Sequence, residues 1–93
     1  MESAGLRVLA IDYGDVVIMQ GLELDVAAQG ASEDQARERF DTALRVELLE
    51  CAKNDSDPNE VIGKAPTHFF DSWDSCSPDE SKTDDYELRR CAA

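Results

Sequence analysis

The 93-residue chain carries 21 acidic and nine basic residues, which gives a formal net charge of −12. Its length predicts a single domain with one small core, because a chain of this size buries only ~60% or slightly more of its unfolded surface. The charge argues against direct contact with a nucleic-acid backbone, which requires Lys and Arg to displace counterions, and it favours a basic protein as partner.

The N-terminal residues contain no basic segment and no long apolar run of the kind found in signal peptides and membrane spans. Three cysteines, Cys51, Cys76 and Cys91, are widely spaced and form no Cys/His cluster that would bind zinc. We therefore expect a cytoplasmic protein with free thiols, no cofactor and no membrane partner.

Three short segments rich in branched aliphatic side chains predict an antiparallel sheet. They span residues 6–12, 16–22 and 26–29. The first turn contains Gly14, which can take a positive φ. Gly21, near the end of the second segment, indicates a bulge or a close approach of the backbone.

A helix is predicted from Glu33 to about Lys53. Ser32 and Gln35 form an S-x-x-Q capping box at its start, in which the two side chains satisfy backbone N–H groups. The apolar residues of this segment form one stripe for packing on the sheet: Ala36, Phe40, Ala43, Leu44, Leu48, Cys51 and Ala52. The chain therefore predicts an α+β fold, in which one long helix packs on a three-stranded antiparallel sheet.

After the long helix, residues 60–63 offer a fourth strand, and residues 67–75 predict a short C-terminal helix that begins after Pro66. The rings of Phe69, Phe70 and Trp73 share one face of that helix. Two alternatives are open for these rings: a partner-facing aromatic patch, or a cover for an otherwise open face of the sheet or the helix.

The predicted domain spans residues 1–75, and residues 76–93 are predicted to form an acidic, flexible tail. Residues 54–87 contain ten acidic and two basic side chains, so two-thirds of the net charge lies there. A polar, acidic composition with few apolar residues is typical of segments that do not pack into a core.

Candidate catalytic residues are few. His68 is the only histidine, and it lies beside two phenylalanines in an amphipathic segment, so a surface or partly packed role is favoured. Residues 8–14, VLAIDYG, weakly resemble the first strand of ribonuclease-H-like nucleases, in which an aspartate at the place of Asp12 holds Mg²⁺. The chain is too short for the later strands of that fold. We predict that the protein is not an enzyme and has no catalytic, cofactor-binding or metal-binding residues, with a metal-dependent nuclease using Asp12 as an alternative.

The segment 21–36, GLELDVAAQGASEDQA, contains a Leu-Glu pair closing a strand, a short strand ending in Gln-Gly, and a capped helix start. In these features it resembles the HicB-like antitoxin family. The positions that carry the resemblance are Leu22, Glu23, Asp25, Gln29, Gly30, Ser32 and Gln35. Residues 62–66, followed by the aromatic residues, look like a C-terminal extension seen in one branch of that family.

The resemblance implies a β-β-β-α core related to a truncated ribonuclease H fold without its active site. It also implies a homodimer or tetramer, and capture of a small basic ribonuclease toxin of the HicA type. Full antitoxins usually add a DNA-binding domain, and nothing after Ser75 has the pattern of one, so a standalone member is expected. The alternative function is an acidic nucleic-acid mimic, of the anti-CRISPR type, that inhibits a nucleic-acid-binding enzyme; regularly spaced acids on one rigid face would favour it.

Overall fold

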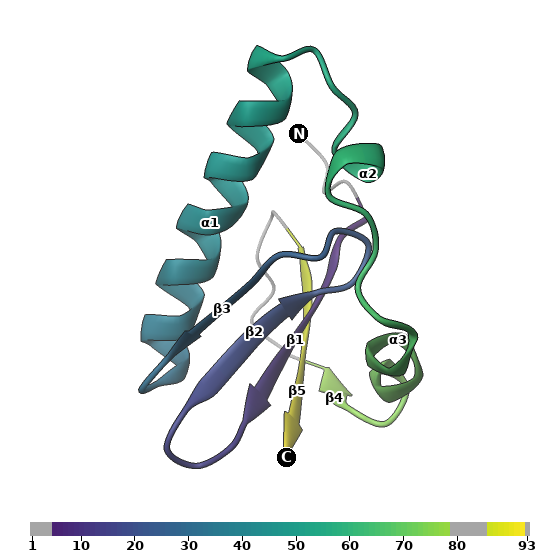
Figure 1. The fold of residues 1–93 in the computed structure, drawn as a ribbon. Helices are drawn as coiled ribbons and strands as arrows, with labels where there is room; N and C mark the ends of the chain where they lie inside the picture. The colour runs from purple at the N-terminus through teal and green to yellow at the C-terminus, as the bar shows by residue number, and fades with distance from the viewer. Residues whose placement is uncertain (1–4, 79–85, 93) are drawn as a thin grey trace.

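The computed structural model describes residues 5–78 and 86–92. Its elements are, in chain order, β1 (Arg7–Asp12), β2 (Val17–Gly21), β3 (Ala27–Gly30), α1 (Glu33–Lys53), α2 (Pro58–Val61), α3 (Thr67–Trp73), β4 (Ser77–Pro78) and β5 (Glu87–Ala92). The strands form one sheet in the order β3-β2-β1-β5-β4, with α1 on one side and α3 on the other (Figure 1). The predicted α+β fold, with a long helix packed on a sheet, is confirmed.

The sheet is larger than expected, and it is mixed. β1, β2 and β3 pair antiparallel, as predicted, but β5 pairs with β1 in parallel. Residues 77–78 and 87–92 are therefore strands of the domain, and the predicted boundary after residue 75 does not separate them from it. Residues 79–85 and 93 of the predicted tail lie outside the described residues. β5 belongs to the sheet because its backbone bonds to β1 and β4, while Leu88 enters the core.

The fourth strand predicted at residues 60–63 is wrong, because the chain forms the helical turn α2 there. Asp57 is the N-cap of this turn, and its side chain accepts a hydrogen bond from the backbone N–H of Asn59 at 3.0 Å. Pro58 occupies the first helical position, where its fixed φ fits and its missing N–H costs nothing. The turn residues 54–58, NDSDP, therefore connect the end of α1 to the start of α2.

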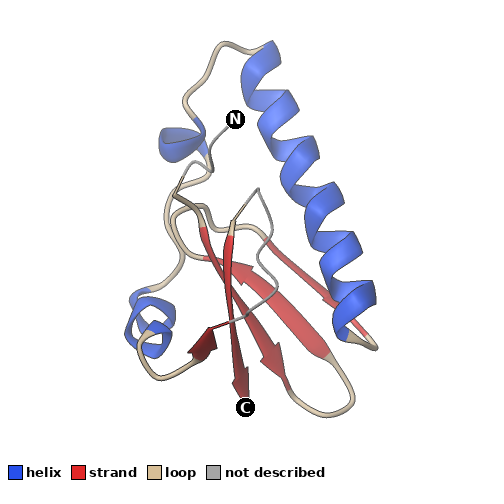
Figure 2. Ribbon diagram, turned by 180° about the vertical axis from the view of Figure 1, so that it is seen from behind, coloured by secondary structure: helices blue, strands red, loops and turns tan. Residues whose placement is uncertain are grey.

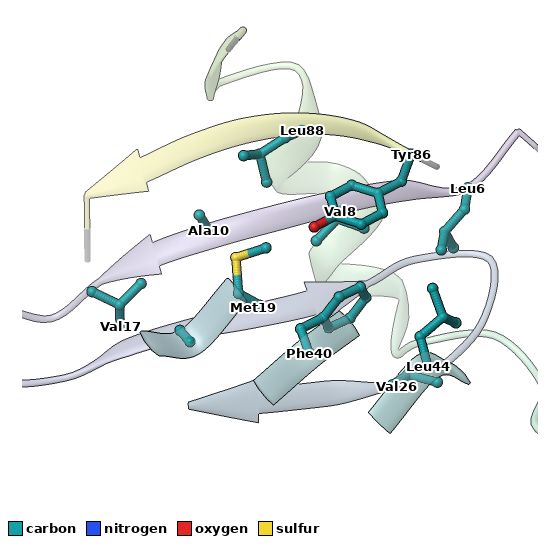
Figure 3. Close-up of a cluster of buried hydrophobic side chains, with 11 residues drawn as sticks. Leu6, Val8, Ala10, Val17, Met19, Val26, Phe40, Leu44, Tyr86 and Leu88 are labelled. Atoms are coloured by element: carbon teal, nitrogen blue, oxygen red, sulfur yellow. The ribbon is translucent and has the colours of Figure 1, made fainter. Parts of the chain in front are cut away.

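The main core lies between α1 and the sheet (Figure 3). Side chains of β1, β2 and β5 face the helix, where Phe40 and Leu44 meet them. Tyr86 packs edge-on against Phe40, with 5.5 Å between ring centroids, and its hydroxyl donates to Asp41 Oδ1 at 2.9 Å. Because Tyr86 directly precedes β5, this contact ties the C-terminal strand to α1.

Local chemistry at the start of α1 and at the end of β2 follows the prediction closely. Ser32 Oγ accepts from the N–H of Gln35 at 3.2 Å, while Gln35 Oε1 accepts from the N–H of Ala31 at 2.7 Å, one residue before the cap. A Cβ on Gly21 would lie 2.5 Å from the carbonyl oxygen of Leu24. The close backbone approach predicted at Gly21 is therefore present, and it leaves no room for a side chain.

The predicted apolar stripe of α1 is only partly covered. Ala36, Phe40 and Leu44 are buried against the sheet, whereas Leu48 and Ala52 are exposed. The last turns of α1 extend past the end of the sheet, so no strand lies beneath them (Figure 1). Helical periodicity gives the direction of a stripe, but the length of the sheet decides how much of it is buried.

Cys76 and Cys91 form a disulfide, with their Cα atoms 4.9 Å apart, and Cys51 is a buried free thiol. The expectation of three free thiols is therefore wrong for this pair. The bond joins the turn after α3 to β5, two segments that only the sheet brings together. In the described part of the chain, no helix has both the length and the apolar character needed to cross a membrane.

Candidate functional site

The aromatic segment α3 covers the sheet face that points away from α1 (Figure 2). Trp73 is only 5% exposed, and Phe69 and Phe70 are half-buried. The cluster that they join contains three aliphatic side chains of the sheet and its corner, Leu9, Ile11 and Leu22. This packing agrees with the alternative in which the rings cover an open sheet face. Trp73 offers little surface to a partner in this arrangement.

Two arginine side chains hold α3 in place. The guanidinium carbon of Arg89 lies 4.4 Å from the centroid of the Trp73 ring, and Arg89 Nη1 donates to the Trp73 carbonyl oxygen at 2.7 Å. The guanidinium of Arg7 lies 5.3 Å from the Phe70 ring and 5.5 Å from the Trp73 ring. Cation–π contacts of this kind contribute ~0.5–1 kcal/mol each at exposed sites. Both arginines come from the sheet, so they bind α3 to β1 and β5.

Of the positions that carry the predicted HicB-like resemblance, here called the signature, the first support the corner after β2. Leu22 is fully buried. Glu23 accepts from the backbone N–H and from Nε of Arg7, both at 2.7 Å. Asp25 Oδ1 accepts from Nε2 of Gln20 at 2.9 Å. These side chains are occupied in holding the backbone of the corner, and their roles in this structure are structural.

The remaining signature residues connect β3 to α1. The carbonyl oxygen of Gln29 accepts from Arg39 Nη1 at 3.0 Å. A Cβ on Gly30 would lie 2.6 Å from a backbone nitrogen of α1, so the strand and the helix meet closely there. Ser32 and Gln35 then cap the helix, as described above. The signature as a whole builds a strand–turn–helix junction.

Asp12 lies at the rim of a cleft of about 540 Å³ between the carboxyl ends of β1 and β5 and the start of α1. Its Oδ1 accepts from the backbone N–H two residues later at 2.8 Å, which is the geometry of a turn. Glu33, on the same cleft, receives two hydrogen bonds of 2.7 Å from Arg90. Within residues 5–78 and 86–92, no three His, Cys, Asp or Glu side chains gather closely enough to hold a metal ion. His68 is exposed on α3, with its ring centroid 4.1 Å from that of Phe69.

Sequence reasoning missed a different surface. Of the five large hydrophobic side chains that are exposed in the described part of the chain, only Tyr13 lies in the β1–β2 turn. The other four, Val46, Leu48, Leu49 and Val61, belong to the end of α1 and to α2. The sequence signal for Val46 and Leu49 is their position outside the core stripe of α1.

No family model, no curated protein and no solved structure matches the chain. The placement of the predicted residues must therefore be interpreted from geometry. It brings Leu22 and Trp73 into one cluster on the α3 side of the sheet. In the described part of the chain, the apolar end of α1 and the exposed carboxylates are available to another molecule, as is the cleft beside Asp12.

Proposed function

We propose that the chain is a non-catalytic, HicB-like protein that binds a small basic protein, with a HicA-like ribonuclease toxin as the expected partner. The observation that carries this proposal is the excess of exposed carboxylates over exposed basic side chains on the described surface. It is a proposal about binding, and it assigns the chain no catalytic residue, cofactor or direct contact with nucleic acid.

Most arginine side chains are engaged with the chain itself. Five of the eight basic residues in the described part of the chain make such contacts: Arg7 and Arg90 with carboxylates, Arg37 with Glu33, Arg39 with a backbone carbonyl, and Arg89 with Trp73. Exposed carboxylates are spread along the described chain, from Asp12 to Glu87. Pairing an arginine with a carboxylate leaves the net charge of −12 unchanged, so the surface keeps an acidic excess, which attracts and orients a basic partner.

The order of elements also supports the proposal. The meander β1–β2–β3 followed by α1 has the β-β-β-α order that the HicB-like resemblance implies. Self-association into a dimer or tetramer is part of the same proposal. β4 is a poor edge for pairing with another copy, because it has two residues and one is Pro78. The outer edge of β3 is more accessible, although Arg39 covers one of its carbonyl oxygens.

A cytoplasmic location also belongs to the proposal. The Cys76–Cys91 disulfide is the observation against it, because cytoplasmic thiols are normally kept reduced. Because Cys51 is buried, the thiols are alkylated in intact cells and then, without reduction, in denaturant with the same reagent, and the alkylated cysteines are counted by mass spectrometry. Three alkylated cysteines indicate a reducing compartment, and one indicates an oxidising compartment.

The test of partner binding is co-expression with a HicA-like ribonuclease from the same genome. We expect a complex that co-purifies at low salt and dissociates as salt rises, and we expect RNA cleavage to stop in the complex. Full cleavage activity in the presence of excess chain would refute the antitoxin proposal. Light scattering on the purified chain gives the oligomeric state, and a monomer at high micromolar concentration would contradict the self-association.

The same experiment distinguishes the nucleic-acid mimic. If the recovered target is a nucleic-acid-binding enzyme, and its own nucleic acid competes with the chain for one site, the mimic is supported and the antitoxin is not.

A further inference from the structure

The end of α1 and the segment that follows it project from the body of the domain (Figure 1). We call residues 45–61 the arm; it contains the last turns of α1, the connection and α2. Cys51 is the one buried residue of this segment. The arm therefore contributes little to the core, although it contains several large apolar side chains.

These side chains are unusually exposed. Val46 is 51% exposed, Leu48 39%, Leu49 57% and Val61 62%. On α1, Val46 and Leu49 are three residues apart, and Ala52 adjoins both Leu48 and Leu49 at helical spacings of four and three. The three large residues of α1 thus form one continuous apolar strip with Ala52. Single exposed hydrophobic residues are common, but contiguous ones mark surfaces that other molecules cover.

The charges of the arm indicate what kind of molecule would cover it. Its exposed acidic residues are Glu47, Glu50, Asp55, Asp57 and Glu60, and its basic residues are Arg45 and Lys53, so its net charge is −3. A second copy of the same surface would bring like charges together, and nucleic acid would be repelled. A protein with an apolar patch bordered by Lys and Arg complements both properties of the arm.

We propose that the arm is the docking surface for the basic protein partner, with the Val46–Leu48–Leu49–Ala52 strip as its centre. The inference rests on the proposed function and adds the location of the interface. An apolar centre with a charged rim is the usual anatomy of a protein–protein interface, and a few central side chains carry most of its affinity. The aromatic residues of α3 have no part in it, because they are packed on the sheet.

The probe for this inference is a synthetic amphipathic helical peptide of about 18 residues, long enough to form a helix on binding, with Leu on one face and Lys and Arg on the other. Binding to the full chain is measured by calorimetry and by amide chemical shifts in NMR. We expect the shifts to concentrate in the arm. A peptide with Glu in place of Lys and Arg controls for charge, and we expect it to bind much more weakly.

The test variant is Val46→Gln/Leu49→Gln, which removes the apolar centre without changing the net charge. Because both positions are exposed and Gln is a good helix former, the variant is expected to fold, which circular dichroism checks. We expect its affinity for the basic peptide to fall about tenfold, as for the loss of a central interface contact. Thr42→Gln, on α1 before the arm, is the matched control and is expected to bind like the wild type.

Four results would overturn the inference. Unchanged affinity of the double variant, or chemical shifts centred on α3 or on the cleft beside Asp12, would place the interface elsewhere and leave the proposed function standing. Equal binding of the Glu peptide would remove the charge argument for a basic partner. Absence of binding to both the basic peptide and the HicA-like ribonuclease would refute the proposed function itself, and the docking surface with it.

Discussion

Replacing Trp73 with Ala measures how much of the fold depends on α3. The side chain is 5% exposed, it shares a cluster with Leu9, Ile11 and Leu22, and the guanidinium of Arg89 lies over its ring. Truncating a buried Trp costs ~3–5 kcal/mol through lost burial and the cavity that remains. Loss of the cation–π contact adds ~0.5–1 kcal/mol. Since the free energy of unfolding of a native protein is only ~5–15 kcal/mol, the variant is expected to be close to unfolding.

The assay is urea denaturation followed by far-ultraviolet circular dichroism, because Trp73 is the single tryptophan and its fluorescence disappears with the substitution. With a slope of ~1–3 kcal/mol per molar urea, the midpoint should fall by ~1 M or more. Trp73→Phe keeps an aromatic ring, so its free energy of unfolding should fall clearly less than that of Trp73→Ala. A loss below ~1 kcal/mol, the level of ordinary substitutions, would show that the ring is not a core residue. If partner binding were lost at the same time, the partner-facing alternative would hold instead.

Three further predictions concern the backbone, the disulfide and the helix cap. Gly21→Ala should destabilise the domain by ~1–3 kcal/mol in the same urea assay, because the added Cβ meets the carbonyl oxygen of Leu24 at 2.5 Å; an unchanged midpoint would mean that the corner relaxes freely. Replacing both Cys76 and Cys91 by Ser should cost ~3 kcal/mol for a loop of 15 residues, and dithiothreitol should then have no further effect. Dithiothreitol should lower the thermal midpoint of the wild type to about that of the double Ser variant. An unaltered wild-type midpoint in dithiothreitol would argue against the bond. Ser32→Ala should cost ~1 kcal/mol through loss of the bond to the first turn of α1, whereas Ser32→Asp should keep most of the stability.

The parts of the fold that the sequence predicted depend on local chemistry. The strands before residue 31 follow from aliphatic segments separated by turn residues, and α1 follows from its cap and its periodic apolar residues. The requirement for glycine at position 21 was also visible, because a glycine near the end of a strand commonly marks a close backbone approach. The position of Phe69, Phe70 and Trp73 on one helix face was predicted, but both readings of that face remained open.

The C-terminal strand β5 was missed for a physical reason. Residues 87–92, ELRRCA, include three charged side chains and would be read as solvated in isolation. Their strand conformation comes from parallel pairing with β1, some 80 residues earlier in the chain. Parallel pairing needs a long crossover connection and leaves no local turn signal. In the folded chain, Arg89 and Arg90 lie on opposite faces of the sheet. Arg89 contacts Trp73 of α3, and Arg90 pairs with Glu33 of α1.

The sequence by itself determined the local elements: the β-hairpin, the glycine corner, the capped helix α1 and the excess of negative charge. The tertiary structure decided which parts of those elements meet. It paired Cys76 with Cys91, buried Trp73 against the far side of the sheet, and ended the sheet before α1 ended. Burial and pairing depend on the distance between segments that are remote in the chain, and composition and periodicity contain no such distances. For that reason the exposure of Leu48, which joins Val46 and Leu49 into one strip, became visible only in the folded chain.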